Sequence, residues 1–189
     1  MNLAIFASGN GSNFEAIVNG VNNGVINNVT VKILIVDHKD AYVIERAKRL
    51  NIKYEVVLLK DFSSKEEYEK HILTILKKEQ INYIALAGYM KIITSTLLDA
   101  YPSRIINIHP ALLPSFKGAH GILDAFNYGC KVFGVTIHYV SSELDGGQII
   151  AQRAFEYYGS DIEELESKIH EVEHELYPEV INRIAKERL

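Results

Sequence analysis

The 189-residue sequence has little of several features that define large classes of protein. Cys130 is its only cysteine, so the chain can form neither an intrachain disulfide nor a cysteine metal cluster, which fits a reducing compartment. No apolar run approaches the ~20 residues of a membrane span, and the N-terminus lacks the basic start and long apolar core of a signal peptide. We therefore expect a cytoplasmic globular protein.

The charge balance is also unremarkable. The sequence carries 24 acidic and 20 basic residues, a formal net charge of −4. This balance offers no electrostatic footprint for nucleic acid or for an anionic membrane surface, so we expect neither partner. Local basic pockets stay compatible with it, and a phosphorylated substrate would need one.

Short β-branched runs alternate with amphipathic helical patterns through most of the chain. Several runs are apolar on both faces, which is typical of parallel strands buried between helices. The alternation indicates right-handed βαβ crossovers in an open doubly wound sheet. The expected strands are residues 3–7, 29–36, 54–58, 83–87 and 104–108, with helices expected around residues 14–21, 44–50 and 68–76.

The pattern changes after Lys131. Residues 132–140 and 148–155 are expected to form two neighbouring strands, and residues 161–189 one long helix that Pro178 kinks. No linker, repeat or low-complexity tract interrupts the chain. The expected fold is one α/β domain, residues 1–189, with an open doubly wound, mostly parallel sheet, a β extension and a long C-terminal helix.

A glycine-containing segment, residues 8–13, separates the first expected strand from the first helix. Glycines permit tight turns and close approach of a ligand, and a helix N-terminus favours an anion such as phosphate. The segment is neither a P-loop nor a good dinucleotide fingerprint. The alternative is a plain strand–helix turn in which Ser12 or Asn13 caps the helix.

A polar pair stands at the end of the strand expected at 104–108. The period of two places Asn107 and His109 on one face, and Pro110 keeps His109 extended. An amide and an imidazole at the carboxyl end of a strand can bind an oxyanion and move a proton. Asp145, on a later Gly-Gly loop, would favour the protonated imidazole if it lay close to it. The alternative is a capping Asn, a structural His and an ordinary turn Asp.

Five short motifs, in order along the chain, resemble those of the folate-dependent formyltransferases: Gly11-Ser12-Asn13, Leu86-Ala87-Gly88-Tyr89-Met90, Asn107-Ile108-His109-Pro110 with Leu112-Leu113-Pro114, Leu144-Asp145-Gly146-Gly147, and Glu173-His174 with Tyr177-Pro178. The resemblance covers essentially the whole chain and implies a Rossmann-like formyltransferase fold. The motifs around His109 and Asp145 are general to the family. The first motif, Glu173 and the short length narrow the resemblance to the branch acting on glycinamide ribonucleotide in purine synthesis.

The resemblance implies formyl transfer from 10-formyltetrahydrofolate, a co-substrate, without a metal. It implies three groups of site residues. The catalytic residues would be Asn107, His109 and Asp145. The substrate would be bound through its phosphate and ribose hydroxyls by Gly11, Ser12, Asn13 and Glu173. The folate would be bound by Lys65, Met90, Lys91, Ile92, Ile93 and Asn107. Lysine at two of these positions, where many relatives have arginine, cannot form a planar fork to a carboxylate.

Other functions stay open. A sibling folate enzyme, such as a formyltetrahydrofolate hydrolase or another amine formyltransferase, would share the catalytic motifs. His170 and His174 fit the His-Glu-x-x-His pattern of zinc hydrolases, but we expect both to face solvent, and the motif lacks a third ligand. A nucleotide-binding module without catalysis is a further alternative. Glu173 lies at the edge of an apolar helical stripe, where a carboxylate needs a partner or a ligand. The oligomeric state, a homodimer included, is left open.

Overall fold

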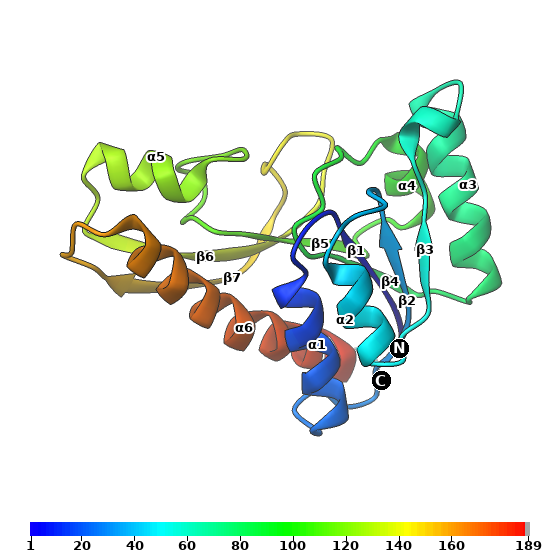
Figure 1. The fold of residues 1–189 in the computed structure, drawn as a ribbon, viewed down its shortest axis with the longest axis horizontal. Helices are drawn as coiled ribbons and strands as arrows, with labels where there is room; N and C mark the ends of the chain where they lie inside the picture. Colours follow the sequence, from blue (N-terminus) through cyan, green and yellow to red (C-terminus); the bar gives the residue numbers. More distant parts are fainter. Residues whose placement is uncertain (188–189) are drawn as a thin grey trace.

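The computed structural model describes residues 1–187 and contains one seven-stranded sheet flanked by helices (Figure 1). The strands are β1 (Asn2–Ala7), β2 (Thr30–Val36), β3 (Tyr54–Val56), β4 (Tyr83–Leu86), β5 (Ile105–His109), β6 (Val132–Tyr139) and β7 (Ile149–Glu156). The helices are α1 (Ser12–Asn22), α2 (Val43–Arg49), α3 (Lys65–Lys78), α4 (Ser95–Ala100), α5 (Gly121–Tyr128) and α6 (Ile162–Glu187), with a 3-10 turn, η1 (Leu59–Asp61).

The sheet has the strand order β3-β2-β1-β4-β5-β6-β7. The first five strands along this order pair in parallel, whereas β6 pairs antiparallel with both β5 and β7. The order reverses between β1 and β4, because the chain moves outward from β1 in one direction and then in the other. Such a switch point opens a crevice at the carboxyl ends of the strands, where ligands bind in open α/β sheets.

Apolar side chains of the central strands alternate between the two faces of the sheet. Leu3 and Ile5 belong to a core shared with α1, α2 and α6, while Ala4 and Phe6 belong to a second core under α3 and α4. Helices therefore cover both faces of the parallel part, as the two-sided apolar pattern predicts. In Figure 1, α6 runs from the β6–β7 end of the molecule to the base of α1.

The expected architecture is confirmed. All seven expected strands are present, although β3 ends at Val56, and the antiparallel pair β6–β7 extends the sheet as predicted. The long helix runs to Glu187 with Pro178 inside it, and the last two residues of the predicted range lie outside the described part. Sequence analysis missed α4, α5 and η1, which are too short for a clear helical period. No helix among residues 1–187 is long and apolar enough to cross a membrane.

Candidate active site

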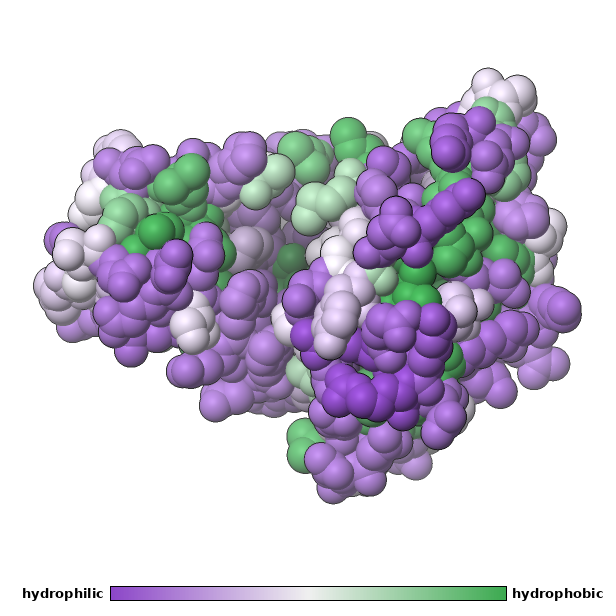
Figure 2. Space-filling view, viewed as in Figure 1, coloured by the Kyte–Doolittle hydropathy of each residue, from purple (hydrophilic) through white to green (hydrophobic). Residues whose placement is uncertain are grey.

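A cavity of about 650 Å³ lies at the carboxyl edge of the sheet, beside the switch point. Its walls come from the loop after β1, the loop after β4, the ends of β5 and β6, the loop that precedes β7, and α6. In the space-filling view the middle of the molecule is hollowed, with apolar and pale residues along its upper edge (Figure 2). All but one of the residues expected to bind or react line this cavity; the exception is Lys65.

The cavity wall contributed by β5 carries the predicted amide–imidazole pair. Asn107 and His109 both line the cavity, and His109 is buried. The antiparallel register places Asn107 opposite His138 and His109 opposite Thr136 on β6. The predicted common face of the two side chains is therefore present, and β6 supplies its neighbours.

His109 lies between two acceptors. Its Nε2 is 2.8 Å from the carbonyl oxygen of Phe116, and its Nδ1 is 3.5 Å from Oδ2 of Asp145. A carbonyl oxygen can only accept a hydrogen bond, so Nε2 must carry a proton to bond to Phe116. A proton on Nδ1 would likewise let the ring donate to the carboxylate of Asp145. A ring with a proton on each nitrogen could donate to both acceptors, and in that form it could stabilise negative charge and release a proton.

Asp145 reaches His109 from the loop between β6 and β7. Its backbone is left-handed, with φ of 49°, a conformation that Asp adopts more readily than most residues. Its side chain is only 7 % exposed, and its Oδ2 accepts a hydrogen bond of 2.8 Å from the N–H of Gly118. Contact with His138, this N–H and the positive charge of His109 lower the pKa of the Asp145 carboxyl to about 2, although desolvation opposes them. The carboxylate is therefore charged at neutral pH.

His138 is a site residue that sequence analysis missed. It is buried on β6; its Nδ1 lies 2.9 Å from the carbonyl of Tyr139 and its Nε2 3.2 Å from Nδ2 of Asn107. With its proton on Nδ1, the ring can donate to the carbonyl of Tyr139 while Nε2 accepts from the Asn107 amide. Oδ1 of Asp145 lies 3.6 Å from the same Nε2, so a ring with a second proton there would instead pair with the carboxylate, which is the contact that lowers the pKa of Asp145. The signal in the sequence was a histidine in alternation with Thr136 on an apolar strand.

The glycine loop enters α1 through Gly11. This residue is the N-cap, in a left-handed conformation with φ of 78°, and no side chain caps the helix. The alternative in which Ser12 or Asn13 caps α1 is therefore wrong. Instead, Nδ2 of Asn13 donates to Oε2 of Glu173 at 2.9 Å, across a buried contact between α1 and α6. The Oδ1 atom of Asn13 is buried without a hydrogen-bond partner in the described structure.

Glu173 is buried, as the helical stripe predicts for a carboxylate that needs partners. The second partner of its Oε2 is Nδ1 of His170, at 2.9 Å, and this contact raises the pKa of His170. His170 is 51 % exposed, as expected for a residue facing solvent, although it also lines the cavity, whereas His174 is partly buried and departs from that expectation. Neighbouring turns of α6 place their rings 6.2 Å apart and nearly parallel. Residues 1–187 contain no group of three or more His, Cys, Asp or Glu side chains placed to hold a metal ion.

The loop after β4 forms an apolar and basic rim. Met90 and Ile92 are 65 % and 66 % exposed, whereas Ile93 is buried. The ammonium of Lys91 lies 3.6 Å from Oδ2 of the buried Asp37.

Lys65 does not line the cavity. Its ammonium lies 5.8 Å from the centre of the Tyr68 ring, and its burial lowers its pKa, with a further contribution from Lys91. The two lysines thus share one region of the surface, with Lys65 outside the cavity wall itself.

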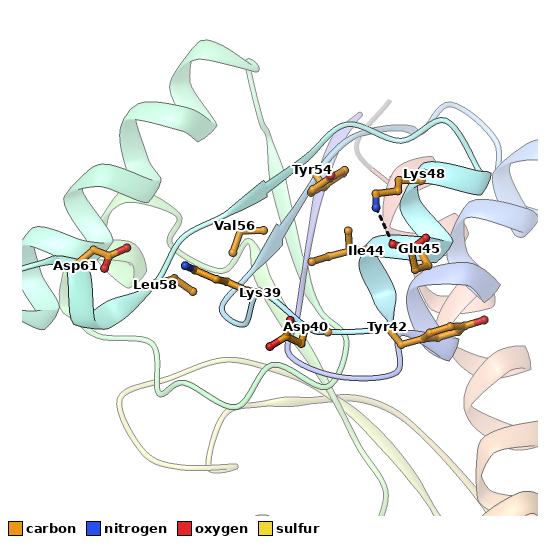
Figure 3. A pocket seen from close by; sticks show the side chains of 11 residues that line it. Lys39, Asp40, Tyr42, Ile44, Glu45, Lys48, Tyr54, Val56, Leu58 and Asp61 are labelled. Atoms are coloured by element: carbon orange, nitrogen blue, oxygen red, sulfur yellow. Dashed lines mark hydrogen bonds and ion pairs between the residues drawn. The ribbon is translucent and has the colours of Figure 1, made fainter.

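A second hollow, of about 610 Å³, lies between α2 and β3 (Figure 3). Its lining includes Lys39, Tyr42 and Asp61, and the close-up shows an ion pair between Lys48 and Glu45 at its edge. None of the residues expected to bind or react lies in it. It contains no histidine, so it lacks the amide–imidazole–carboxylate arrangement of the larger cavity.

The open parallel sheet and the polar group at its switch point are typical of α/β enzymes. Comparison with known proteins specifies the class further. The formyl transferase family matches residues 1–181. Phosphoribosylglycinamide formyltransferase of Bacillus subtilis is 44% identical over 182 residues, covering 96% of this chain and 93% of that protein. The enzyme of the same name from Escherichia coli is 33% identical over 190 residues, covering 100% of this chain and 89% of that protein.

Solved structures agree with this assignment. Glycinamide ribonucleotide transformylase 1 from Geobacillus kaustophilus superposes with a TM-score of 0.94 at 48% identity, over 97% of this chain and 98% of that chain. Phosphoribosylglycinamide formyltransferase from Bacillus halodurans superposes with a TM-score of 0.95 at 44% identity, over 100% and 97% of the two chains. The chain belongs to the formyl transferase family.

Proposed function

We propose that this protein transfers the formyl group of 10-formyltetrahydrofolate to the amine of glycinamide ribonucleotide, a step of purine biosynthesis. The observation that carries the proposal is the convergence of Asn107, His109 and Asp145 on one cavity. Near full-length similarity to enzymes named for this reaction supports it. The chain would act as a single domain.

Two groups of residues in the cavity wall support a place for each substrate. Exposed Met90 and Ile92 offer apolar contact to a flat ring system, and Lys91 offers a cation to the carboxylates of a folate. In the second group, the N-terminus of α1 offers unpaired N–H groups to a phosphate. Asn13 lies in the first turn of this helix, and Glu173, which it contacts, would accept hydrogen bonds from the ribose hydroxyls.

The proposed mechanism uses the hydrogen-bond donors that would surround the formyl carbonyl of the bound folate. Bound 10-formyltetrahydrofolate supplies the formyl group, and a bond forms from the substrate amine to its carbon while the bond to N10 breaks. Asn107 donates its amide N–H to the formyl oxygen, and the charge of His109 stabilises the negative charge developing there. Asp145 pairs with the ring of His109 and, through water, helps to move one proton from the attacking amine to N10.

His138 acts on this chemistry through Asn107. When Nε2 carries no proton, it accepts one N–H of the Asn107 amide and so fixes which way the amide faces. The second N–H of the same nitrogen is then free for the formyl oxygen. We therefore assign His138 as a positioning residue for Asn107.

The test is a direct assay of the purified protein with glycinamide ribonucleotide and 10-formyltetrahydrofolate, in which the folate product is followed by absorbance. The proposal requires that tetrahydrofolate and formylated ribonucleotide form in equal amounts. A control without ribonucleotide measures hydrolysis. Equal rates with and without the ribonucleotide would refute formyl transfer to the amine and identify a hydrolase.

A further inference from the structure

Behind the glycine loop lies an arginine to which neither the motifs nor the proposed mechanism assigns a role. Arg46 belongs to α2, and its guanidinium forms a fork on a single residue of the loop. Its Nε donates to the main-chain oxygen of Asn10 at 2.8 Å, and its Nη2 donates to Oδ1 of Asn10 at 2.7 Å. Its Nη1 pairs with Glu15 on α1. The guanidinium therefore joins α2, the loop and the first turn of α1.

Two further contacts hold the glycine loop, residues 8–13, close to α2. The N–H of Val43 donates to the carbonyl of Gly9 at 3.1 Å. A β-carbon at Gly11 would lie 2.2 Å from Cγ2 of Val43, so only glycine permits this approach. Gly9 and Gly11, on either side of Asn10, thus both contact Val43 of α2.

The fork on Asn10 has a consequence for the amides that follow. In a planar trans peptide the C=O and the next N–H point in opposite directions. A guanidinium that holds the Asn10 carbonyl towards α2 therefore directs the N–H of Gly11 away from α2. The carbonyl of Gly11 accepts from the N–H of Glu15 at 3.0 Å, which starts α1 and leaves the N–H groups of Ser12 and Asn13 without a carbonyl partner among residues 1–187.

We propose that Arg46 is a positioning residue for phosphate binding: it sets the orientation of the loop amides and thereby the affinity for the phosphorylated substrate. This inference rests on the proposed function, in which the loop binds the substrate phosphate. Arg46 acts from behind the loop and takes no part in formyl transfer. A lysine cannot replace it, because a single ammonium cannot donate in one plane to both oxygens of Asn10.

Arg49 provides a matched control. It lies on the same helix and pairs with the other oxygen of Glu15 at 2.7 Å, but it makes no contact with the loop among the hydrogen bonds of residues 1–187. Its side chain is 60 % exposed, compared with 18 % for Arg46. Arg49→Gln therefore removes one positive charge at nearly the same place without releasing Asn10.

The kinetic experiment compares Arg46→Lys and Arg49→Gln with the unaltered enzyme. Because Arg46→Lys loses part of a charge-assisted fork, we expect the KM for the ribonucleotide to rise about tenfold. The KM for the folate, kcat and the melting temperature should stay close to those of the unaltered protein, and Arg49→Gln should match it throughout. A purely structural tie between α2 and the loop would lower kcat and the melting temperature and change both KM values, and that result would overturn the inference.

A second variant and a binding measurement cover the cases in which Arg46→Lys misfolds or no transfer is detected. Asn10→Ala keeps Arg46 and removes only the side-chain acceptor, so the KM for the ribonucleotide should rise roughly threefold. Inorganic phosphate, titrated while the amide NMR signals of Ser12 and Asn13 are followed, should bind more weakly to Arg46→Lys or Asn10→Ala than to Arg49→Gln. Equal phosphate affinity in all of them would refute the role of Arg46. An inactive unaltered enzyme that still shows the graded affinity would refute the proposed function alone.

Discussion

Replacing His138 with leucine tests whether the orientation of the Asn107 amide matters to the reaction. His138 is buried on β6, and leucine keeps most of its volume while removing the acceptor at Nε2. The amide of Asn107 would then be free to rotate, and its N–H would face the formyl oxygen for only part of the time. We expect kcat to fall, with little change in either KM.

The magnitude follows from the number of hydrogen bonds involved. Loss of one neutral hydrogen bond of 3.2 Å is worth ~0.5–1.5 kcal/mol, or roughly two- to tenfold in rate. Loss of the oxyanion donor itself, in Asn107→Ala, should cost about 10²–10³ in kcat. If His138 acts only through Asn107, the double variant should be no slower than Asn107→Ala.

The assay is a double-mutant cycle on kcat at saturating concentrations of both substrates, with circular dichroism to confirm folding. His138→Gln is the conservative control, because its amide oxygen can accept from Asn107 near the position of Nε2. It should retain most of the activity that His138→Leu loses. Independent contributions, in which His138→Leu slows the Asn107→Ala enzyme by the same factor as the unaltered enzyme, would refute the positioning role.

Four other predictions address the remaining parts of the site. His109→Ala should lower kcat at least ~100-fold while the protein stays folded by circular dichroism, since both charge stabilisation and proton transfer are lost. Asp145→Asn should lower the unfolding free energy, measured by urea denaturation, above about pH 4; because the carboxyl pKa is lowered from 3.8 to about 2, the difference from the unaltered protein should shrink as pH falls between these values. Asn13→Leu should raise the KM for the ribonucleotide, and inorganic phosphate should compete with the ribonucleotide and not with the folate. Transfer should persist after chelation, and metal analysis should find no stoichiometric zinc; chelator-sensitive activity restored by zinc would instead assign His170 to a metal site.

Most of the fold could be predicted from the sequence because its signals are local. The apolar runs at β1, β2 and β4 are buried on both faces, and that requirement is visible in the residues themselves. The short helices α4 and α5 were missed because six to eight residues span about two turns and leave no repeated stripe. Their positions are decided by the loops that bring the chain back to the sheet.

The juxtaposition of Asn107 and His109 was predictable for a related reason. Asn107 and His109 are two residues apart on one strand, so the period of two alone places them together. The burial of Glu173 also followed from a helical stripe. By contrast, the apolar stripe did not indicate that His174 is partly buried, or that the exposed His170 lies at the edge of the cavity.

The residues that could not be predicted are those that tertiary pairing brings to the site. His138 faces Asn107 only because β5 and β6 pair antiparallel in one register, and a shift of one residue would turn His138 to the opposite face of the sheet. Arg46 reaches Asn10 only because α2 packs against the glycine loop through Val43 and Gly11. In both cases one partner lies in or beside a short motif, while the residue that holds it comes from an element more than thirty positions away. A motif can therefore indicate which side chains are candidates for a site, whereas the packing of the whole domain decides their orientation.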